Sequence, residues 1–538
     1  MTKIPAVALT AEEVRDRILT RDREEVALLD LREIGKFGNG HLLWATSLPL
    51  GQLEIKTADL IPRKSVQIIL CSEGENDEFL ISYGSQKLFE FGYKNIFYLF
   101  GGVKAWEKSG FEVFSGINVP SKAFGEFIEN TYNTPRIKPQ KLQKMMEEKK
   151  KFLVLDSRPA EEYSKMNIPG GVNCPGAELV LRIYDLIPDK ETPVIVNCAG
   201  RTRSIIGCQS LKNAKIPNPV FALENGTMGW QLAGYQLEYD GCKFFNNVSV
   251  AGRKKAREAI NHVAKKYRVI SVDWNTVQKW KSEDDRSTFL FDVRQLSEFE
   301  AGHLPTAISA PGGQLIQTTD EYIGVLGARV VLIDNDGIRA TMTASWLQQI
   351  GWKDIFVLDR TTYKEAEVRG QHLSTIYGIS EASCEFLTPV ELKNLLQNKS
   401  INLIDLANST EYQLGHIAGA QNVTREKLYT DMRNIAKKGE LVLTSPKGQQ
   451  AVFASCDLQK FEIKSKVLMG GTASWVSLGF DVQAGSANMD LKPADVWSAP
   501  YDLGDDRESV MKKYLSWEID LVQQIKRDGT TVFKKFPN

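Results

Sequence analysis

The chain has 538 residues, of which 42% are hydrophobic and 25% are charged, as in an ordinary globular protein. Its 67 basic and 67 acidic residues leave no net field to attract a polyanion, which argues against a nucleic-acid partner. Seven cysteines, an odd number without a Cys-x-x-Cys pair, fit neither a disulfide framework nor a common zinc site. At about 150 residues per domain, the length predicts three to four domains.

The beginning of the chain bears on where the protein works. Residues 1–10 are too short and too weakly apolar a segment for a signal peptide. No uninterrupted apolar run is long enough to span a bilayer. We therefore expect a cytoplasmic protein with reduced thiols and no membrane association.

Short apolar runs recur along the chain at fixed spacing. First runs end at Asp30, Asp156, Asp292 and Asp405, and second runs end at Cys71, Cys198, Asp334 and Ser445. The separations of 41, 42, 42 and 40 residues are too regular for independent segments. A helix-like stretch and a third apolar run follow each time, at residues 95–99, 219–223, 354–358 and 465–469. Strands that alternate with helices predict four copies of a parallel α/β unit.

Other residues repeat in the same register. An aromatic residue lies seven positions after each aspartate, and Gly-His follows in three units, at His41, His303 and His416. The second unit has Asn167 there. Because these histidines also occur in units without a nucleophile, we expect them to form local hydrogen bonds rather than to act in catalysis. Units one, two and four close with glycines and Trp106, Trp230 or Trp475, whereas the third has residues 359–363 instead.

Two segments lie outside the repeat. Residues 253–268 predict a basic helix with a narrow apolar stripe of Ala256, Ile260 and Val263, which favours a solvated connector over a polyanion site. The tail from about residue 489 is not a fifth copy. Its 505–528 stretch has Met511, Tyr514, Leu515, Val522 and Ile525 at helical spacing. We expect this helix to pack on the domains as a clasp, with a partner-binding helix as the alternative.

One cysteine has the setting of a reactive thiol. Cys198 follows a run of strand-forming residues and begins a loop that carries Arg201 and Arg203. Loop N–H groups, nearby arginines and the N-terminus of a following helix all favour a thiolate. We therefore expect the pKa of Cys198 to lie below the ordinary value of about 8.5.

The combined pattern resembles the rhodanese family over residues 8–485. The resemblance is strongest in the second unit, where Asn167 replaces the usual histidine; its matching segments are 156–158, 162–163, 168–170, 198–203 and 226–230. The resemblance implies an α/β protein of four tandem rhodanese-like domains, each a mainly parallel sheet flanked by helices, plus a C-terminal helical tail. The expected boundaries are 1–120, 121–245, 246–269 for a helical linker, 270–380, 381–486 and 487–538 for the tail.

The family resemblance also implies a reaction. A sulfurtransferase of this kind moves sulfane sulfur from thiosulfate or a similar donor to a thiol or cyanide acceptor, through a persulfide on Cys198. The expected substrate-binding residues are Arg201, Arg203, Arg182, Ala199, Gly200 and Thr202. Arg203 could instead form a structural ion pair with a nearby carboxylate. We expect no cofactor and no metal, a small sulfur donor and a thiol acceptor as partners, and degenerate domains that could bind a protein.

The other three loops differ at the position of the nucleophile. Cys71 keeps the sulfur, but Glu73 and Glu75 would raise its pKa and repel an anionic donor, and Asn76 stands where Arg203 does. It stays open as a second or relay cysteine. Asp334 and Ser445 cannot hold a persulfide. Domain 2 is therefore expected to be catalytic, and the other three degenerate.

Two other functions remain open. A cysteine-dependent phosphatase or arsenate reductase also uses a loop thiolate with an arginine, but its loop is one residue longer than the one from Cys198 to Arg203. A sulfur-carrier or scaffold protein would hold sulfur on Cys198 and bind partners through its degenerate domains. Catalytic turnover would separate an enzyme from a carrier.

Overall fold

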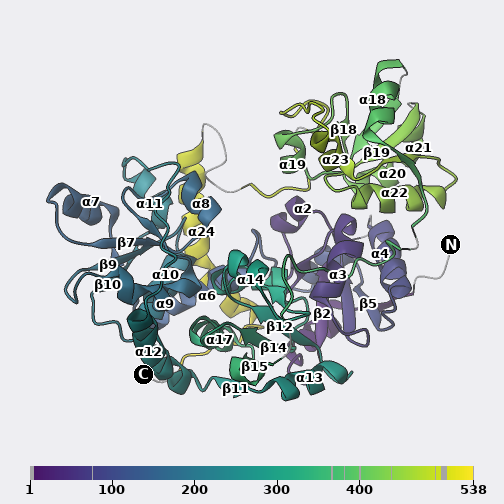
Figure 1. Ribbon diagram of the computed structural model, residues 1–538. Helices are drawn as coiled ribbons and strands as arrows, with labels where there is room; N and C mark the ends of the chain where they lie inside the picture. Colours follow the sequence, from purple (N-terminus) through teal and green to yellow (C-terminus); the bar gives the residue numbers. More distant parts are fainter. Residues whose placement is uncertain are drawn as a thin grey trace.

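Four parallel sheets follow one another along the chain (Figure 1). The computed structural model describes residues 5–74, 77–364, 367–380, 382–398, 401–437, 439–490, 492–498 and 506–536. Each sheet has five strands, and the first has the order β1-β5-β4-β2-β3, which the other three repeat. Helices flank every sheet, so the predicted fourfold α/β repeat is confirmed. We number the domains 1 to 4 by their sheets.

The first two domains share one order of elements. Domain 1 comprises β1 (Val7–Leu9), α1 (Ala11–Leu19), β2 (Val26–Asp30), α2 (Ile34–Asn39), β3 (Thr46–Ser47), α3 (Leu53–Leu60), β4 (Gln67–Cys71), α4 (Glu78–Glu90), β5 (Ile96–Leu99) and α5 (Gly102–Lys108). Helix α6 (Val119–Tyr132) leads to domain 2. That domain comprises β6 (Arg136–Ile137), α7 (Pro139–Glu147), β7 (Leu153–Asp156), α8 (Ala160–Lys165), β8 (Val172–Asn173), α9 (Leu179–Leu186), β9 (Val194–Asn197), α10 (Thr202–Asn213), β10 (Val220–Leu223) and α11 (Gly226–Leu232).

The last two domains follow a long connecting helix, α12 (Val250–Tyr267). Domain 3 comprises β11 (Ile270–Val272), α13 (Trp274–Ser282), β12 (Thr288–Asp292), α14 (Leu296–Ala301), β13 (Ile308–Ser309), α15 (Gly312–Gln317), α16 (Thr319–Tyr322), β14 (Arg329–Ile333), α17 (Ile338–Ile350) and β15 (Ile355–Leu358). Domain 4 comprises β16 (Glu385–Leu387), α18 (Pro389–Asn398), β17 (Ile401–Asp405), α19 (Ser409–Leu414), β18 (Gln421–Asn422), α20 (Arg425–Thr430), α21 (Met432–Ala436), β19 (Glu440–Thr444), α22 (Gln449–Gln459), β20 (Lys466–Leu468) and α23 (Gly471–Ser477).

The repeated aspartates end a central strand in every domain. In domain 2, Asp156 pairs in register with Asn197 of β9, so that Cys198 follows at the carboxyl edge of the sheet. The Arg158 side chain folds back on this turn, and its Nε donates to Asp156 Oδ1 at 2.9 Å. The same fork recurs at Arg32 and Arg294 in domains 1 and 3. Both residues of each fork are buried, so the fork is a structural feature of the strand end.

The repeated histidines form local contacts, as predicted. His303 lies 2.9 Å through its Nδ1 from the carbonyl oxygen of Phe299, and its ring stacks on that side chain. His41 and His416 repeat this arrangement. Asn167 donates its amide to the Tyr163 carbonyl at the equivalent turn of domain 2.

Two helices outside the sheets join the domains. Helix α12 packs between α9 and α17 through a buried face that contains Ala256, Ile260 and Val263, so the predicted stripe is confirmed. In the tail, α24 (Arg507–Asp528) packs along α6 and reaches domain 2, which confirms the predicted helix; residue 505 lies outside the described residues. Figure 1 shows α24 in yellow, and it lies along α6.

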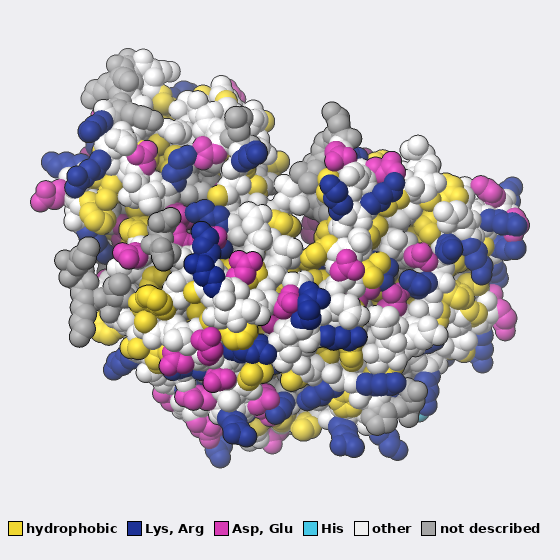
Figure 2. All heavy atoms as spheres, turned by 180° about the vertical axis from the view of Figure 1, so that it is seen from behind, with side chains coloured by type: hydrophobic (Ala, Val, Ile, Leu, Met, Phe, Trp, Pro, Cys, Tyr) yellow, Lys and Arg dark blue, Asp and Glu magenta, His cyan; other side chains and the backbone are white. Residues whose placement is uncertain are grey.

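Buried ion pairs also cross between domains. Arg339 of domain 3 pairs with Glu178 of domain 2 at 3.0 Å, and Arg425 of domain 4 pairs with Glu54 of domain 1 at 2.8 Å. On the face drawn in Figure 2, basic and acidic side chains are intermixed, in keeping with the equal numbers of the two. None of the helices in the described ranges combines the length and apolar character that crossing a membrane requires.

Candidate active site

The Cys198 loop is held at the carboxyl edge of the second sheet. All four residues of β9 are buried, and α10 begins at Thr202, four positions after Cys198. The first turn of α11 fixes the loop from the other side, since Thr227 N–H donates to the Cys198 carbonyl at 2.9 Å. Gly226 has a φ of 55°, and a Cβ there would lie 2.3 Å from the Cys198 oxygen. Only glycine allows this close approach, which accounts for the repeated glycine that closes the unit.

The Cys198 thiol is almost fully buried, with 2% of the residue exposed. Burial raises its pKa, and the negative charge of Glu518 acts in the same direction. Arg203 and hydrogen bonds from the backbone and side chain of Ser204 oppose this shift without overcoming it. The expectation of a lowered pKa is therefore wrong for this arrangement of the chain, because the loss of hydration outweighs the cationic loop.

Arg203 lies at the end of the loop, with its guanidinium paired to α8. Its Nη1 contacts Glu162 Oε1 at 2.6 Å, and Nη2 contacts Oε2 at 2.8 Å. Its positive charge still acts on Cys198 and favours the thiolate. Arg203 thus combines a bidentate structural pair with an electrostatic effect on the sulfur.

Arg201 contributes to the wall of the cavity, but its charge is already compensated. Its Nη2 donates to Glu126 Oε2 at 2.8 Å, and the same guanidinium pairs with Glu129. Both carboxylates belong to α6, outside the second sheet. Arg201 therefore ties the loop to the helix that joins domains 1 and 2.

The structure does not bring Arg182 to the loop. Its Nε donates to Glu178 Oε2 at 2.9 Å, and Nη1 contacts the Phe245 carbonyl and the Asn246 side chain. Arg182 is buried and is absent from the lining of the cavity at Cys198. The expectation that Arg182 binds substrate at the Cys198 loop is thus corrected. Its partner Glu178, one helical turn earlier in the chain, holds the guanidinium outside the cavity.

The loop opens onto a cavity of about 250 Å³. Cys198 and the expected loop residues Ala199, Gly200, Arg201, Thr202 and Arg203 all line it. Distant segments complete the wall: Lys122 from α6, Gln314 and Gln317 from α15, and Trp497, Tyr514 and Glu518 from the tail. The cavity is therefore built from domains 2 and 3, the end of domain 1 with the connecting helix α6, and the C-terminal tail.

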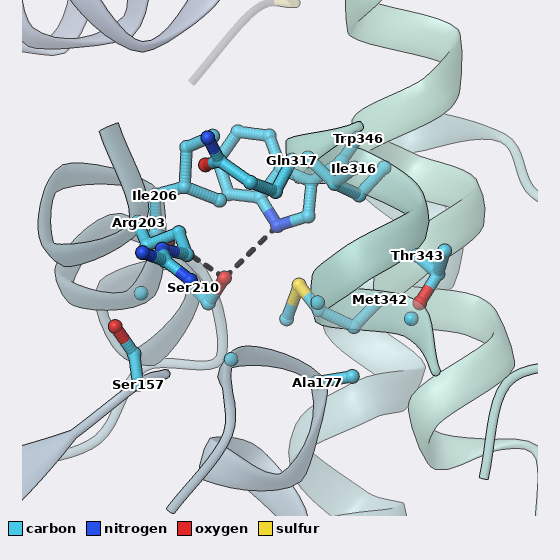
Figure 3. A pocket seen from close by; sticks show the side chains of 14 residues that line it. Ser157, Ala177, Arg203, Ile206, Ser210, Ile316, Gln317, Met342, Thr343 and Trp346 are labelled. Carbon is cyan, nitrogen blue, oxygen red and sulfur yellow. Dashed lines mark hydrogen bonds between the residues drawn. The ribbon is translucent and has the colours of Figure 1, made fainter. Parts of the chain in front are cut away.

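A smaller cavity of about 30 Å³ lies behind α10, where domains 2 and 3 meet (Figure 3). Arg203 and Gln317 line both cavities. The Trp346 indole crosses this boundary and donates to Ser210 Oγ at 2.9 Å. The remaining wall of this smaller cavity is largely apolar and excludes Cys198, so the larger cavity holds the candidate nucleophile.

Sequence reasoning missed four residues at this site. Ser204 was recognisable as the residue after the loop, and its hydrogen bonds to Cys198 follow from its place in the first turn of α10. Tyr514 was identified only as part of an apolar stripe. Lys122 and Glu518 gave no signal, because they belong to helices far from Cys198 in the sequence.

The three sister loops hold different groups at the same place. Cys71 is fully buried, which raises the pKa of its thiol well above the ordinary range; Asp30 adds to this effect. Glu73 is paired with Arg32 at 2.5 Å. Glu75 and Asn76, on which the prediction of a repelled anionic donor also rests, lie outside the described residues. In domain 4, Ser445 Oγ accepts from Ala451 N–H at 3.3 Å.

Asp334 of domain 3 shows which groups of such a loop bind an anion. Its carboxylate accepts hydrogen bonds from the N–H groups of Gly337 at 2.6 Å, Arg339 at 2.8 Å and Ala340 at 3.2 Å. Ala340 holds the position of Ser204, the residue whose N–H bonds Cys198. The domain 3 loop is thus a cradle of N–H groups for a negative charge, and Cys198 keeps one of these groups, the N–H of Ser204. In the described ranges, no three His, Cys, Asp or Glu side chains group as ligands for a metal ion.

Comparisons with known proteins agree with this geometry. The profile of the rhodanese-like domain matches residues 10–109, 138–233, 274–362 and 388–478. The crystal structure of a thiosulfate sulfurtransferase from Pseudomonas aeruginosa is 40% identical, covers 99% of this chain and 100% of that chain, and has a TM-score of 0.93. A rhodanese-like domain protein from Staphylococcus aureus is 20% identical over 19% of this chain and 99% of its own, with a TM-score of 0.18.

A curated relative matches over a shorter stretch. An HTH-type transcriptional regulator from Mycobacterium tuberculosis is 31% identical over 86 residues, which are 16% of this chain and 37% of the regulator. The chain thus spans little more than a third of that protein. With four matched domains and a whole-length similarity to a solved sulfurtransferase, the chain belongs to the rhodanese family and is an enzyme of the rhodanese type.

Proposed function

We propose that this enzyme moves sulfane sulfur from thiosulfate or a similar donor to a thiol or cyanide acceptor through a persulfide on Cys198. The observation that carries the proposal is the place of Cys198, which accepts hydrogen bonds from Ser204 and lines a cavity. Cys71, its sister in domain 1, is sealed inside the core. A nucleophile needs both a stabilised anion and access to its substrate.

The proposed reaction has two covalent steps. The Cys198 thiolate attacks the outer sulfur of thiosulfate and forms a new sulfur–sulfur bond. The sulfur–sulfur bond of thiosulfate breaks, and sulfite leaves with the bonding electron pair. An acceptor then attacks the outer sulfur of the persulfide, and Cys198 leaves as the thiolate.

The Asp334 loop supports the capacity of this fold to hold a persulfide. The Asp334 carboxylate stands at the position of the cysteine and accepts hydrogen bonds from three backbone N–H groups. A persulfide carries its charge on the outer sulfur, close to the same groups. The N–H groups of the 198–204 loop would therefore stabilise it, with Ala199, Gly200 and Thr202 as the residues beside the bound donor.

Neither loop arginine offers a free guanidinium to a donor, and only Arg203 would favour the Cys198 thiolate through its charge. Arg203 is bidentate to Glu162, and Arg201 is paired with Glu126 and Glu129. Such pairing disfavours a phosphatase, in which a guanidinium fork must bind a phosphate dianion. It suits sulfur transfer better, because the main charge to be stabilised is on one sulfur atom.

Turnover is the test of this proposal. With thiosulfate and cyanide both in excess, an enzyme releases many molecules of sulfite and thiocyanate per chain. A sulfur carrier stops after one sulfur atom per chain, and a phosphatase hydrolyses p-nitrophenyl phosphate instead. Sulfite release beyond one equivalent, without phosphate ester hydrolysis, is the expected result.

A further inference from the structure

The C-terminal helix places an acidic side chain in the wall of the Cys198 cavity. Glu518 of α24 is 2% exposed, and its Oε2 is buried without a hydrogen-bond partner. The carboxylate lies beside the loop, since a Cβ added at Gly200 would be 3.2 Å from Glu518 Oε2. Its other oxygen, Oε1, accepts from the Tyr514 hydroxyl at 3.2 Å. One carboxylate oxygen is thus oriented by Tyr514, and the other is left for a ligand.

Apolar packing fixes the helix in this position. Met511 and Leu515 of α24 form a buried cluster with Ala199 of the loop and Met228 of α11. Farther along, Leu521 and Ile525 pack with Val119 and Ala123 of α6. Contacts on both sides of Glu518 therefore hold it against the loop, so its place in the cavity does not depend on its own charge.

A buried carboxylate oxygen without a hydrogen-bond partner costs free energy of folding, which favours a functional role for Glu518 Oε2. The negative charge of Glu518 opposes the Cys198 thiolate and would repel an anionic sulfur donor. It is therefore unfavourable for the first half of the reaction. The second half needs a different group, because a thiol acceptor must lose its proton to become a good nucleophile.

We propose that Glu518 is the general base that accepts the proton of the thiol acceptor during transfer of sulfur from Cys198. This inference rests on the proposed function. The acceptor sulfur attacks the outer sulfur of the Cys198 persulfide anion, the bond between the two sulfurs on Cys198 breaks, and Cys198 leaves as a thiolate. The acceptor's proton moves to Glu518 Oε2, so the products are the acceptor persulfide anion, the Cys198 thiolate and a neutral Glu518. The proton then passes to solvent.

The surroundings of Glu518 suit a base that works near neutral pH. Burial raises its pKa to about 7, and the like charge of Glu126 on α6 adds to that effect. Lys122 on α6, Arg201 of the loop and the Tyr514 hydroxyl on α24 oppose the shift, and Cys198 itself faces the carboxylate. The basic form is therefore present above about pH 7 and disappears as the pH falls below it.

The test separates the two half-reactions. The full-length persulfide form is prepared with thiosulfate, freed of donor, and mixed with either dithiothreitol or sulfite, and the loss of persulfide is followed by mass spectrometry. Sulfite carries no proton that must be removed when it takes the sulfur back. Glu518→Gln should slow transfer to the thiol, whereas transfer to sulfite should be as fast as in the wild type or faster, because the variant removes a negative charge that repels this anion.

The size of the effect follows from thiol ionisation. A thiol with a pKa of about 8.5 is ionised in roughly one molecule in thirty at pH 7. We therefore expect Glu518→Gln to lower the maximal rate with the thiol by about thirtyfold at pH 7, and this loss should shrink above about pH 9, where the thiol ionises unaided. Formate added to Glu518→Ala should restore part of the rate.

Asp520 gives a matched control on the same helix, since it is exposed two positions later. Asp520→Asn should match wild type with both acceptors. The inference would be overturned if Glu518→Gln slowed persulfide transfer to the thiol and to sulfite equally, or slowed neither. Absence of persulfide in the wild-type protein would instead overturn the proposed function, and the base assignment with it.

Discussion

Arg203 and Glu162 form a bidentate ion pair at the Cys198 loop, and Arg339 and Glu298 form the equivalent pair in domain 3. The shortest contacts are 2.6 Å in both. Domain 3 has Asp334 where domain 2 has Cys198, so the pair does not depend on thiol chemistry. It fastens the end of the loop to the helix after the first central strand. Its electrostatic effect on Cys198 is added to that structural role.

Removal of Glu162 should therefore affect stability. Burial opposes ionisation of Glu162, but Arg203 outweighs it and holds the pKa of Glu162 below its ordinary range. Glu162→Gln should lower the free energy of unfolding by roughly 1–3 kcal/mol at pH 7, because Arg203 loses its charged partner. A lowered carboxyl pKa stabilises the fold above the ordinary value and loses this effect as the pH falls. The difference in urea denaturation should therefore shrink below about pH 4.

Glu298→Gln is the matched control for that variant. It removes the same type of partner from Arg339 and should destabilise the protein in the same direction. Sulfite release by the folded protein should stay within about twofold of wild type, because Glu298 lies outside the Cys198 cavity. A loss of sulfite release well beyond twofold in folded Glu298→Gln would contradict the separation of the two loops.

Arg182 should matter for stability and not for donor binding. Its side chain is buried against Glu178, so Arg182→Ala should cost roughly 1–3 kcal/mol of unfolding free energy. The KM for thiosulfate should change less than about twofold, since Arg182 does not line the cavity. A tenfold rise in the KM for thiosulfate at unchanged stability would show instead that Arg182 contributes to donor binding.

The apolar contacts of α24 should control access to Cys198. Leu515 is 6% exposed and packs on Ala199 and Met228. Leu515→Ala should weaken docking of the helix by about 2–5 kcal/mol and speed alkylation of Cys198 by iodoacetamide. Ile519, which is 49% exposed on the same helix, provides the control, and Ile519→Ala should leave the alkylation rate unchanged. Equal alkylation rates in the two variants would argue against a shielding role for the helix.

The buried thiol also predicts a pH dependence. Because burial raises the pKa of Cys198 above the ordinary value, the thiol form dominates at neutral pH. The rate of alkylation should therefore rise with pH without reaching a plateau below about pH 9. Leu515→Ala, which admits water, should move this rise to lower pH. A plateau below pH 7 in the wild-type enzyme would show that the cationic loop outweighs burial.

Much of the fold could be predicted because it is repeated. The strands end at Asp30, Asp156, Asp292 and Asp405, as the spacing of apolar runs indicates. The loop at Cys198 follows from the same alignment, since parallel strands place their carboxyl ends at one edge of a sheet. Local periodicity also identified α24, whose apolar side chains recur at helical intervals.

Only the part of the site that lies next to Cys198 in the sequence could be predicted. Glu162 lies one strand away from Arg203, and Glu126 and Glu518 belong to helices outside the second sheet. Nothing in the pattern of one unit shows which distant helix will cover its loop. The expected pKa of Cys198 was wrong for a similar reason: the cations lie next to Cys198 in the sequence, whereas its burial depends on the packing of the folded chain.

Persulfide mapping tests the central claim most directly. The full-length protein is incubated with thiosulfate, digested without reductant, and each cysteine-containing peptide is analysed by mass spectrometry. We predict one added sulfur atom on the Cys198 peptide of the wild type and of Cys71→Ser, and none in Cys198→Ala. Persulfide retained in Cys198→Ala and lost in Cys71→Ser would contradict the account and move the chemistry to domain 1.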